Sequence, residues 1–153
     1  MAARSRSEKP RLVAVRTVVN GPLQRRPLPG LRRNQPRRLD PIRRTLFPRI
    51  VSGRDAGQAY SLLLPLDYSP TRRYPLVLIL DSRGDALVPL ARFGPPADRL
   101  GFVVMSSYNS ASDGPVEPNI GAVNAMLGDA WRALSIDTTR VYLVGFSGTA
   151  RFS

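Results

Sequence analysis

One serine late in the sequence stands where a sharp chain reversal is expected. Residues 141–144 (Val-Tyr-Leu-Val) are typical of a buried strand, and Gly145, Phe146, Ser147 and Gly148 follow directly. A small residue two positions before a serine allows so tight a turn that the serine takes a strained backbone conformation and presents its hydroxyl. A serine presented in this way can attack a carbonyl carbon. The segment therefore indicates a hydrolytic nucleophile at Ser147.

The match to the usual pattern G-x-S-x-G is incomplete. Thr149 occupies the second glycine position, where a β-branched side chain is expected to crowd the turn. The expected strand before the serine, and a helix opening at residues 148–150, supply the context that the motif requires. The structural alternative is a tight strand-to-helix turn in which Ser147 only caps the helix.

The sequence lacks the usual partner of such a serine. A serine nucleophile needs a base to accept its proton, and the chain contains no histidine. The only lysine is Lys9, far from the motif in the sequence. The carboxylates of the expected loops, those of Asp81, Asp85, Asp113 and Glu117, are interpreted as turn caps rather than as an acid, a base or metal ligands. We therefore expect the chain to be inactive by itself.

Composition limits the other kinds of chemistry. With neither cysteine nor histidine, thiolate sites are excluded and a transition-metal site is not expected, so we predict no metal and no cofactor. No apolar run approaches the roughly 20 residues that cross a membrane, and the N-terminus does not resemble a secretory signal. These features favour a cytoplasmic location.

The positive charge is confined to one end of the chain. The first 50 residues carry 13 arginines and Lys9 against two acids, whereas residues 51–153 are neutral overall. Five prolines lie between residues 22 and 41, and proline and like charges both oppose a helix. Residues 1–46 are therefore predicted to form a disordered basic arm, followed by a folded domain over residues 47–153.

Three interpretations of the basic arm remain open. It could bind nucleic acid or another anionic surface, although no aromatic residue for base stacking precedes Phe47. It could be an organelle transit peptide, which the prolines disfavour. It could also be a non-functional extension translated from GC-rich DNA, which suits 22 arginines against one lysine, and we favour this reading.

The pattern of residues 47–153 predicts strands that alternate with helices. Apolar runs and turn signals place strands at residues 47–52, 58–65, 76–80, 102–106 and 141–144. The first two are expected to form a hairpin. Helices are expected at residues 86–100, with an interruption at Gly94-Pro95-Pro96, and at residues 120–134. This order indicates an α/β fold, a mostly parallel sheet with an N-terminal antiparallel hairpin.

The second helix shows the clearest periodicity. Its expected core face contains apolar residues at helical spacing: Ile120, Val123, Met126, Leu127, Ala130, Trp131 and Leu134. At the carboxyl ends of the parallel strands, the loops at residues 81–85, 106–118 and 145–149 are expected to converge, where ligands of such sheets gather.

Several of these segments resemble the α/β-hydrolase superfamily. They are the Tyr-Pro step at residues 74–75 into the strand at 76–80, the strand at 102–106, and Asp137 with Arg-Val-Tyr-Leu-Val-Gly-Phe-Ser-Gly at 140–148. The pattern is most similar to polyhydroxyalkanoate depolymerase-like, feruloyl-esterase-like and dienelactone-hydrolase-like enzymes. The resemblance covers residues 47–153.

The resemblance implies roles for three residues. Ser147 would be the nucleophile that attacks an ester carbonyl, and the backbone N–H of Gly148 would be one donor to the oxyanion. The second donor would come from the loop at residues 81–85, where Arg83 is our candidate. The substrate would be a small ester or a polyester. The acid and the histidine of the triad would follow the serine in chain order, so the sequence is expected to contain an incomplete domain that ends at the nucleophile turn.

The resemblance also implies a strand order of 1-2-4-3-5-6-7-8. Residues 141–144 would then belong to the fifth strand, and without its next neighbour this strand would be an apolar edge prone to self-association. Two functions are therefore weighed. The first is an incomplete serine esterase or depolymerase-like hydrolase. The second is a non-catalytic protein that binds nucleic acid or an anionic membrane through its basic arm.

Overall fold

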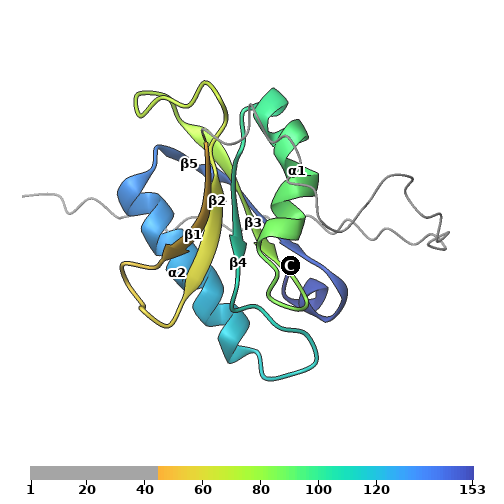
Figure 1. Ribbon diagram of the computed structural model, residues 1–153. Helices are drawn as coiled ribbons and strands as arrows, with labels where there is room; N and C mark the ends of the chain where they lie inside the picture. Colours follow the sequence, from red (N-terminus) through yellow and green to blue (C-terminus); the bar gives the residue numbers. More distant parts are fainter. Residues whose placement is uncertain (1–44) are drawn as a thin grey trace, which may run out of the picture.

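The computed structural model describes residues 45–153 as one five-stranded sheet with a helix on each face (Figure 1). The strands lie in the order β1-β2-β4-β3-β5, which confirms the expected order of the first five. In chain order they are β1 (Leu46–Val51), β2 (Ala59–Leu63), β3 (Tyr74–Leu80), β4 (Val103–Ser107) and β5 (Ile136–Gly145). The predictions about residues 1–44 of the basic arm lie outside the described residues.

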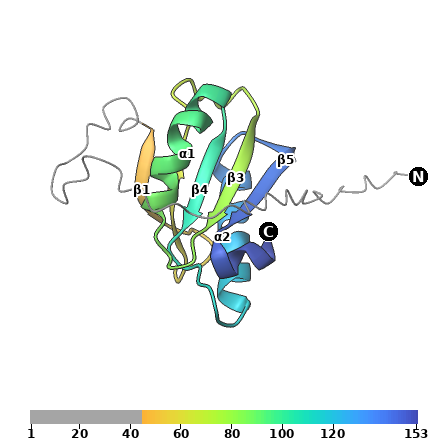
Figure 2. The same cartoon turned by 90° about the vertical axis from the view of Figure 1, so that its right-hand side faces the viewer.

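The pairing of the strands gives a mixed but mostly parallel sheet. β3 runs parallel to β4 and to β5, whereas β2 pairs antiparallel with both β1 and β4. The predicted N-terminal hairpin is therefore confirmed, with β1 beginning one residue earlier than expected. Figure 2 shows β1 and β5 at opposite margins of the sheet.

The core has two layers because both faces of the sheet are covered. Alternate side chains of β3 point to opposite faces, so Leu76, Leu78 and Leu80 pack toward α2 (Glu117–Ala133), while Ile79 packs toward α1 (Leu87–Leu100). Burial on both faces explains why β3 is continuously apolar rather than alternating.

The helix α1 differs from its prediction. It continues through Pro95 and Pro96, where we expected an interruption. Each proline lacks the N–H that would bond the carbonyl four residues earlier, on Ala91 or Arg92. Both of those residues are exposed, so water can satisfy their carbonyl groups. Gly94 has no Cβ to clash with the following proline ring.

The helix α2 is rotated from its predicted orientation. Met126, Leu127 and Ala130 are buried as expected, but Ile120 and Trp131 are 52% and 42% exposed. The buried stripe instead includes Ala122 and Ala125, whose small side chains allow close approach to the sheet, and the polar residues Asn119 and Asp129. No helix in the described part is long and apolar enough to cross a membrane.

Candidate functional site

The predicted nucleophile turn, residues 145–149, has the expected backbone geometry. β5 ends at Gly145, and a short 3₁₀ helix, η2 (Ser147–Phe152), begins two residues later. Ser147 has a φ of 58°, in the left-handed region that residues other than glycine rarely adopt. Its side chain is exposed. Such a conformation costs about 1–3 kcal/mol and persists only where its surroundings impose it.

Gly145 is required by the closeness of the turn. A Cβ at this position would lie 2.5 Å from the carbonyl carbon of Thr149 and 2.6 Å from the nitrogen of Ala150. The chain therefore folds back onto its own backbone at Gly145, and only a hydrogen fits there.

Thr149 does not crowd the turn, contrary to our expectation. Its side chain is fully buried, and its hydroxyl lies 2.8 Å from the nitrogen of Phe146 and 2.7 Å from the carbonyl oxygen of Leu80. The side chain points into the protein between β3 and η2, so the branch on Cβ fills interior space.

The three loops at the carboxyl ends of the parallel strands converge as predicted. The Ser110 hydroxyl donates to the carbonyl oxygen of Asp81, and the Ser112 N–H donates to that of Ser82. The loop at residues 106–118 also touches the nucleophile turn, since a Cβ at Gly148 would lie 2.5 Å from Cβ of Ser112. Asp113, in the same loop, has a φ of 61°. Within residues 45–153, Ser147 and Asp113 are the two non-glycine residues with positive φ, so backbone strain is concentrated here.

The two candidate oxyanion donors differ in their surroundings. Gly148 is the second residue of η2, and the first N–H groups of a helix have no partner within it. The N–H of Arg83, in contrast, donates to Oδ1 of Asp81 at 2.9 Å. Arg83 would have to exchange this bond for one to a substrate oxygen.

The N–H of Ser82 is a further candidate donor, which the sequence did not single out. Among residues 45–153 this group donates to no acceptor. The sequence does contain a signal that distinguishes the two groups. An aspartate two residues before Arg83 is the pattern of a turn in which the carboxylate accepts the backbone N–H two positions later, so this pattern engages the N–H of Arg83 and not that of Ser82.

The carboxylates of the first loop act as caps, as predicted. Oδ1 of Asp81 accepts the N–H of Arg83 and that of Asp85, while Oδ1 of Asp85 accepts the N–H groups of Leu87 and Val88 at the start of α1. Within the described residues, no three histidine, cysteine or acidic side chains are grouped to hold a metal ion.

A cavity of about 360 Å³ lies beside the nucleophile turn. Its lining combines polar loop residues with an apolar wall from α1 and the residue before the serine: Asp81, Ser82, Arg83, Asp85, Val88, Pro89, Arg92 and Phe146. Phe146 connects this cavity to Ser147. The cavity therefore adjoins the turn around Ser147.

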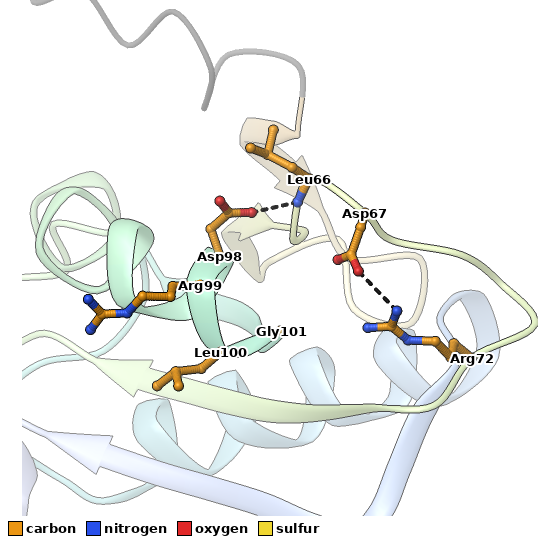
Figure 3. A pocket seen from close by; sticks show the side chains of 7 residues that line it. All are labelled: Leu66, Asp67, Arg72, Asp98, Arg99, Leu100 and Gly101. Carbon is orange, nitrogen blue, oxygen red and sulfur yellow. Dashed lines mark hydrogen bonds and ion pairs between the residues drawn. The ribbon is translucent and has the colours of Figure 1, made fainter.

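A second hollow, of about 320 Å³, lies at the other end of the sheet (Figure 3). It is formed where the chain enters β3 and where α1 ends, so it is at the amino ends of the parallel strands. Its carboxylates are already engaged, because Asp98 accepts the N–H of Leu66 and Asp67 pairs with Arg72. Its position separates it from Ser147.

Comparison with known proteins supports the fold. No family model and no curated protein matches the sequence. Among solved structures, the chain is similar to a thermostable esterase, with 22% identity and a TM-score of 0.51 over 68% of this chain and 34% of the esterase. A ferulic acid esterase (14%, TM-score 0.45, 68% of this chain and 49% of that one) and the AtxE2 isopeptidase (24%, 0.41, 67% and 19%) also match.

At 22% identity, the likeness to the thermostable esterase concerns the fold alone. The described part of the chain has an α/β-hydrolase-like fold. The chain spans about a third of the length of that esterase.

Proposed function

We propose that Ser147 is the nucleophile of a serine-dependent ester hydrolase whose base lies outside these 153 residues. The observation that carries the proposal is the left-handed conformation of an exposed serine at a strand-to-helix turn. A serine that only capped a helix would have extended backbone angles, because cap residues have φ and ψ in the β region.

In the proposed reaction, Oγ of Ser147 bonds to the carbonyl carbon of an ester, and its proton passes to a base. The carbonyl oxygen becomes an oxyanion, which the N–H of Gly148 and a second N–H from the loop at residues 81–85 would stabilise. The alcohol then leaves with a proton, and water hydrolyses the acyl-enzyme. For the second donor, the N–H of Ser82 is favoured over that of Arg83, because Arg83 already donates to Asp81.

The cavity beside Phe146 supports the proposed substrate class. Its volume of about 360 Å³ is near the lower end of ligand pockets, which suits a small acyl or alcohol group or one terminal unit of a polyester. Hydrolysis of a soluble ester and depolymerisation are both compatible with a cavity that is open to solvent.

The proposal is tested with a fluorophosphonate probe and added imidazole, which replaces the missing base. We expect imidazole to accelerate labelling of the full chain, and mass spectrometry to place the label on Ser147. Ser147→Ala should abolish this labelling. Ser112→Ala, which removes a neighbouring hydroxyl that bonds the carbonyl of Ser82, should retain it. A label spread over several serines, or one unaffected by Ser147→Ala, would refute the assignment.

A further inference from the structure

We infer that Thr149 is a positioning residue whose hydroxyl holds Ser147 in its left-handed conformation. The side chain of Thr149 lies two residues after the serine, is fully buried, and contacts both the turn and the neighbouring strand. The inference concerns the residue that departs from the pattern G-x-S-x-G.

The hydroxyl of Thr149 is bonded on both its acceptor and its donor side. It accepts the N–H of Phe146, the residue immediately before Ser147, at 2.8 Å. Its single hydrogen is shared between the carbonyl oxygens of Leu80, at 2.7 Å, and Phe146, at 2.8 Å. The peptide groups flanking Phe146 are therefore fixed relative to η2, and the chain can reach Ser147 only along this restrained path.

The contact with Leu80 links the two halves of the proposed site. Leu80 is the last residue of β3, and the loop that would supply the second oxyanion donor begins at Asp81. The same hydroxyl therefore restrains both the peptide before the nucleophile and the start of the oxyanion loop. A glycine at position 149 would have no group to make either bond.

The burial of the hydroxyl makes these bonds consequential. Without it, the N–H of Phe146 keeps only a longer contact to Leu80 at 3.3 Å. A buried donor or acceptor left without a partner is costly, so the turn would relax to satisfy it. We expect this relaxation to release the positive φ of Ser147, because a strained conformation persists only where several contacts impose it.

The test compares Thr149→Val, which keeps the shape and removes the hydroxyl, with Thr149→Ser, which keeps the hydroxyl and removes the methyl group. Nuclear magnetic resonance measures the amide exchange of Phe146 and the ¹³Cα and ¹³Cβ shifts of Ser147 that report its φ. We expect Thr149→Val to accelerate Phe146 exchange about tenfold and to move the Ser147 shifts away from left-handed values. Thr149→Ser should change the exchange rate of Phe146 by no more than about twofold and should leave the Ser147 shifts at left-handed values.

The matched control is Ser61→Ala on β2. It removes another fully buried hydroxyl, which donates to the carbonyl of Pro48 on β1 at 2.7 Å. It should leave Phe146 and Ser147 unchanged. If Thr149→Val does not fold, as judged by amide protection in β3 and β4, the Ser147 shifts of Thr149→Ser test the inference. A folded Thr149→Ser protein with relaxed Ser147 shifts overturns the inference, as does a folded Thr149→Val protein with the original shifts.

The consequence for reactivity rests on the proposed function, whereas the conformational measurement does not. If Ser147 is labelled in the presence of imidazole, Thr149→Val should slow that labelling about tenfold and Thr149→Ser should restore it. If Ser147 is never labelled, the proposed function fails, and the exchange and chemical shifts still decide the role of Thr149.

Discussion

At the scale of single residues, the predicted nucleophile turn requires a residue without a Cβ atom at position 145. Gly145 is where β5 ends, and the backbone of Thr149 and Ala150 occupies the place of a side chain there. Gly114 offers the opposite case, since nothing lies within 4 Å of the position of its Cβ. The two glycines therefore separate the steric demand of the turn from the general effect of adding a methyl group.

Gly145→Ala should destabilise the protein by about 1–3 kcal/mol, because an added methyl group in a filled space forces the backbone of η2 to shift. Gly114→Ala should change the free energy of unfolding by less than about 0.5 kcal/mol. Urea unfolding followed by circular dichroism measures both. Equal effects at the two positions would show that the turn has room for a side chain.

The sequence was informative about Ser147 because the signals are local. The strand, the glycine and the serine lie within seven residues, and their spacing alone predicts the turn. Thr149 could not be interpreted in the same way, because its decisive partner, Leu80, is 69 residues away in the chain. Arg83 differs from Thr149, because the acceptor of its N–H, Asp81, lies only two residues earlier in the chain.

At the scale of elements, a buried carboxylate joins α2 to the hairpin. Asp129 is almost fully buried and accepts hydrogen bonds from the N–H of Gly53, the hydroxyl of Tyr60 and the guanidinium of Arg132, each at 3.1 Å. Burial, followed by the charge and hydrogen bond of Asp129, raises the pKa of Tyr60, so its hydroxyl stays protonated and able to donate. This anchor explains part of the rotation of α2 that periodicity did not predict.

Asp129→Ala should destabilise the protein by about 2 kcal/mol, because the N–H of Gly53 and the hydroxyl of Tyr60 lose their acceptor in a buried place. Asp67→Ala is the control, since it breaks an exposed ion pair with Arg72 and should cost less than about 1 kcal/mol. Thermal unfolding of both variants measures the difference. A similar loss in the two proteins would mean that Asp129 does not anchor the helix.

The start of β5 contains a second polar cluster, on the surface. Asp137 accepts hydrogen bonds from the hydroxyl and N–H of Thr139 and from Nε of Arg140, and these lower its pKa to about 2. The ordinary pKa of an aspartate is about 3.9, so the folded state binds fewer protons than the unfolded state between these values. The stabilisation is present above about pH 4 and is lost as the pH falls toward 2.

Thr139→Ala should raise the pKa of Asp137 toward its ordinary value, because the hydroxyl of Thr139 makes the largest contribution to lowering it. The carboxyl ¹³C shift of Asp137, titrated from pH 5 to below 2, measures this change. Thr138→Ala alters the exposed neighbouring residue, whose hydroxyl makes no hydrogen bond to Asp137, and should leave the titration unchanged. An unaltered pKa in Thr139→Ala would assign the shift to Arg140 and to the N–H of Thr139, which alanine keeps.

At the scale of the whole molecule, the two margins of the sheet differ. β1 carries Pro48 and Arg49, and both residue types discourage pairing with another chain. β5 has a strand neighbour on one side only among residues 45–153. Its charged residues, Asp137 and Arg140, lie in its first half, and residues 141–145 contain neither a charge nor a proline. Residues 51–153 are neutral overall, so the domain has little charge to oppose association.

We propose that the chain self-associates through the free edge of β5. Sedimentation velocity should show association that increases with salt, because salt screens the mutual repulsion of the basic first 50 residues. Tyr142→Lys should reduce it, since a charge within an edge strand opposes strand pairing. Trp131→Lys places the same charge at an exposed apolar position on α2. If Trp131→Lys disperses the protein and Tyr142→Lys does not, the contact is made by the exposed face of α2, and the prediction for β5 is wrong.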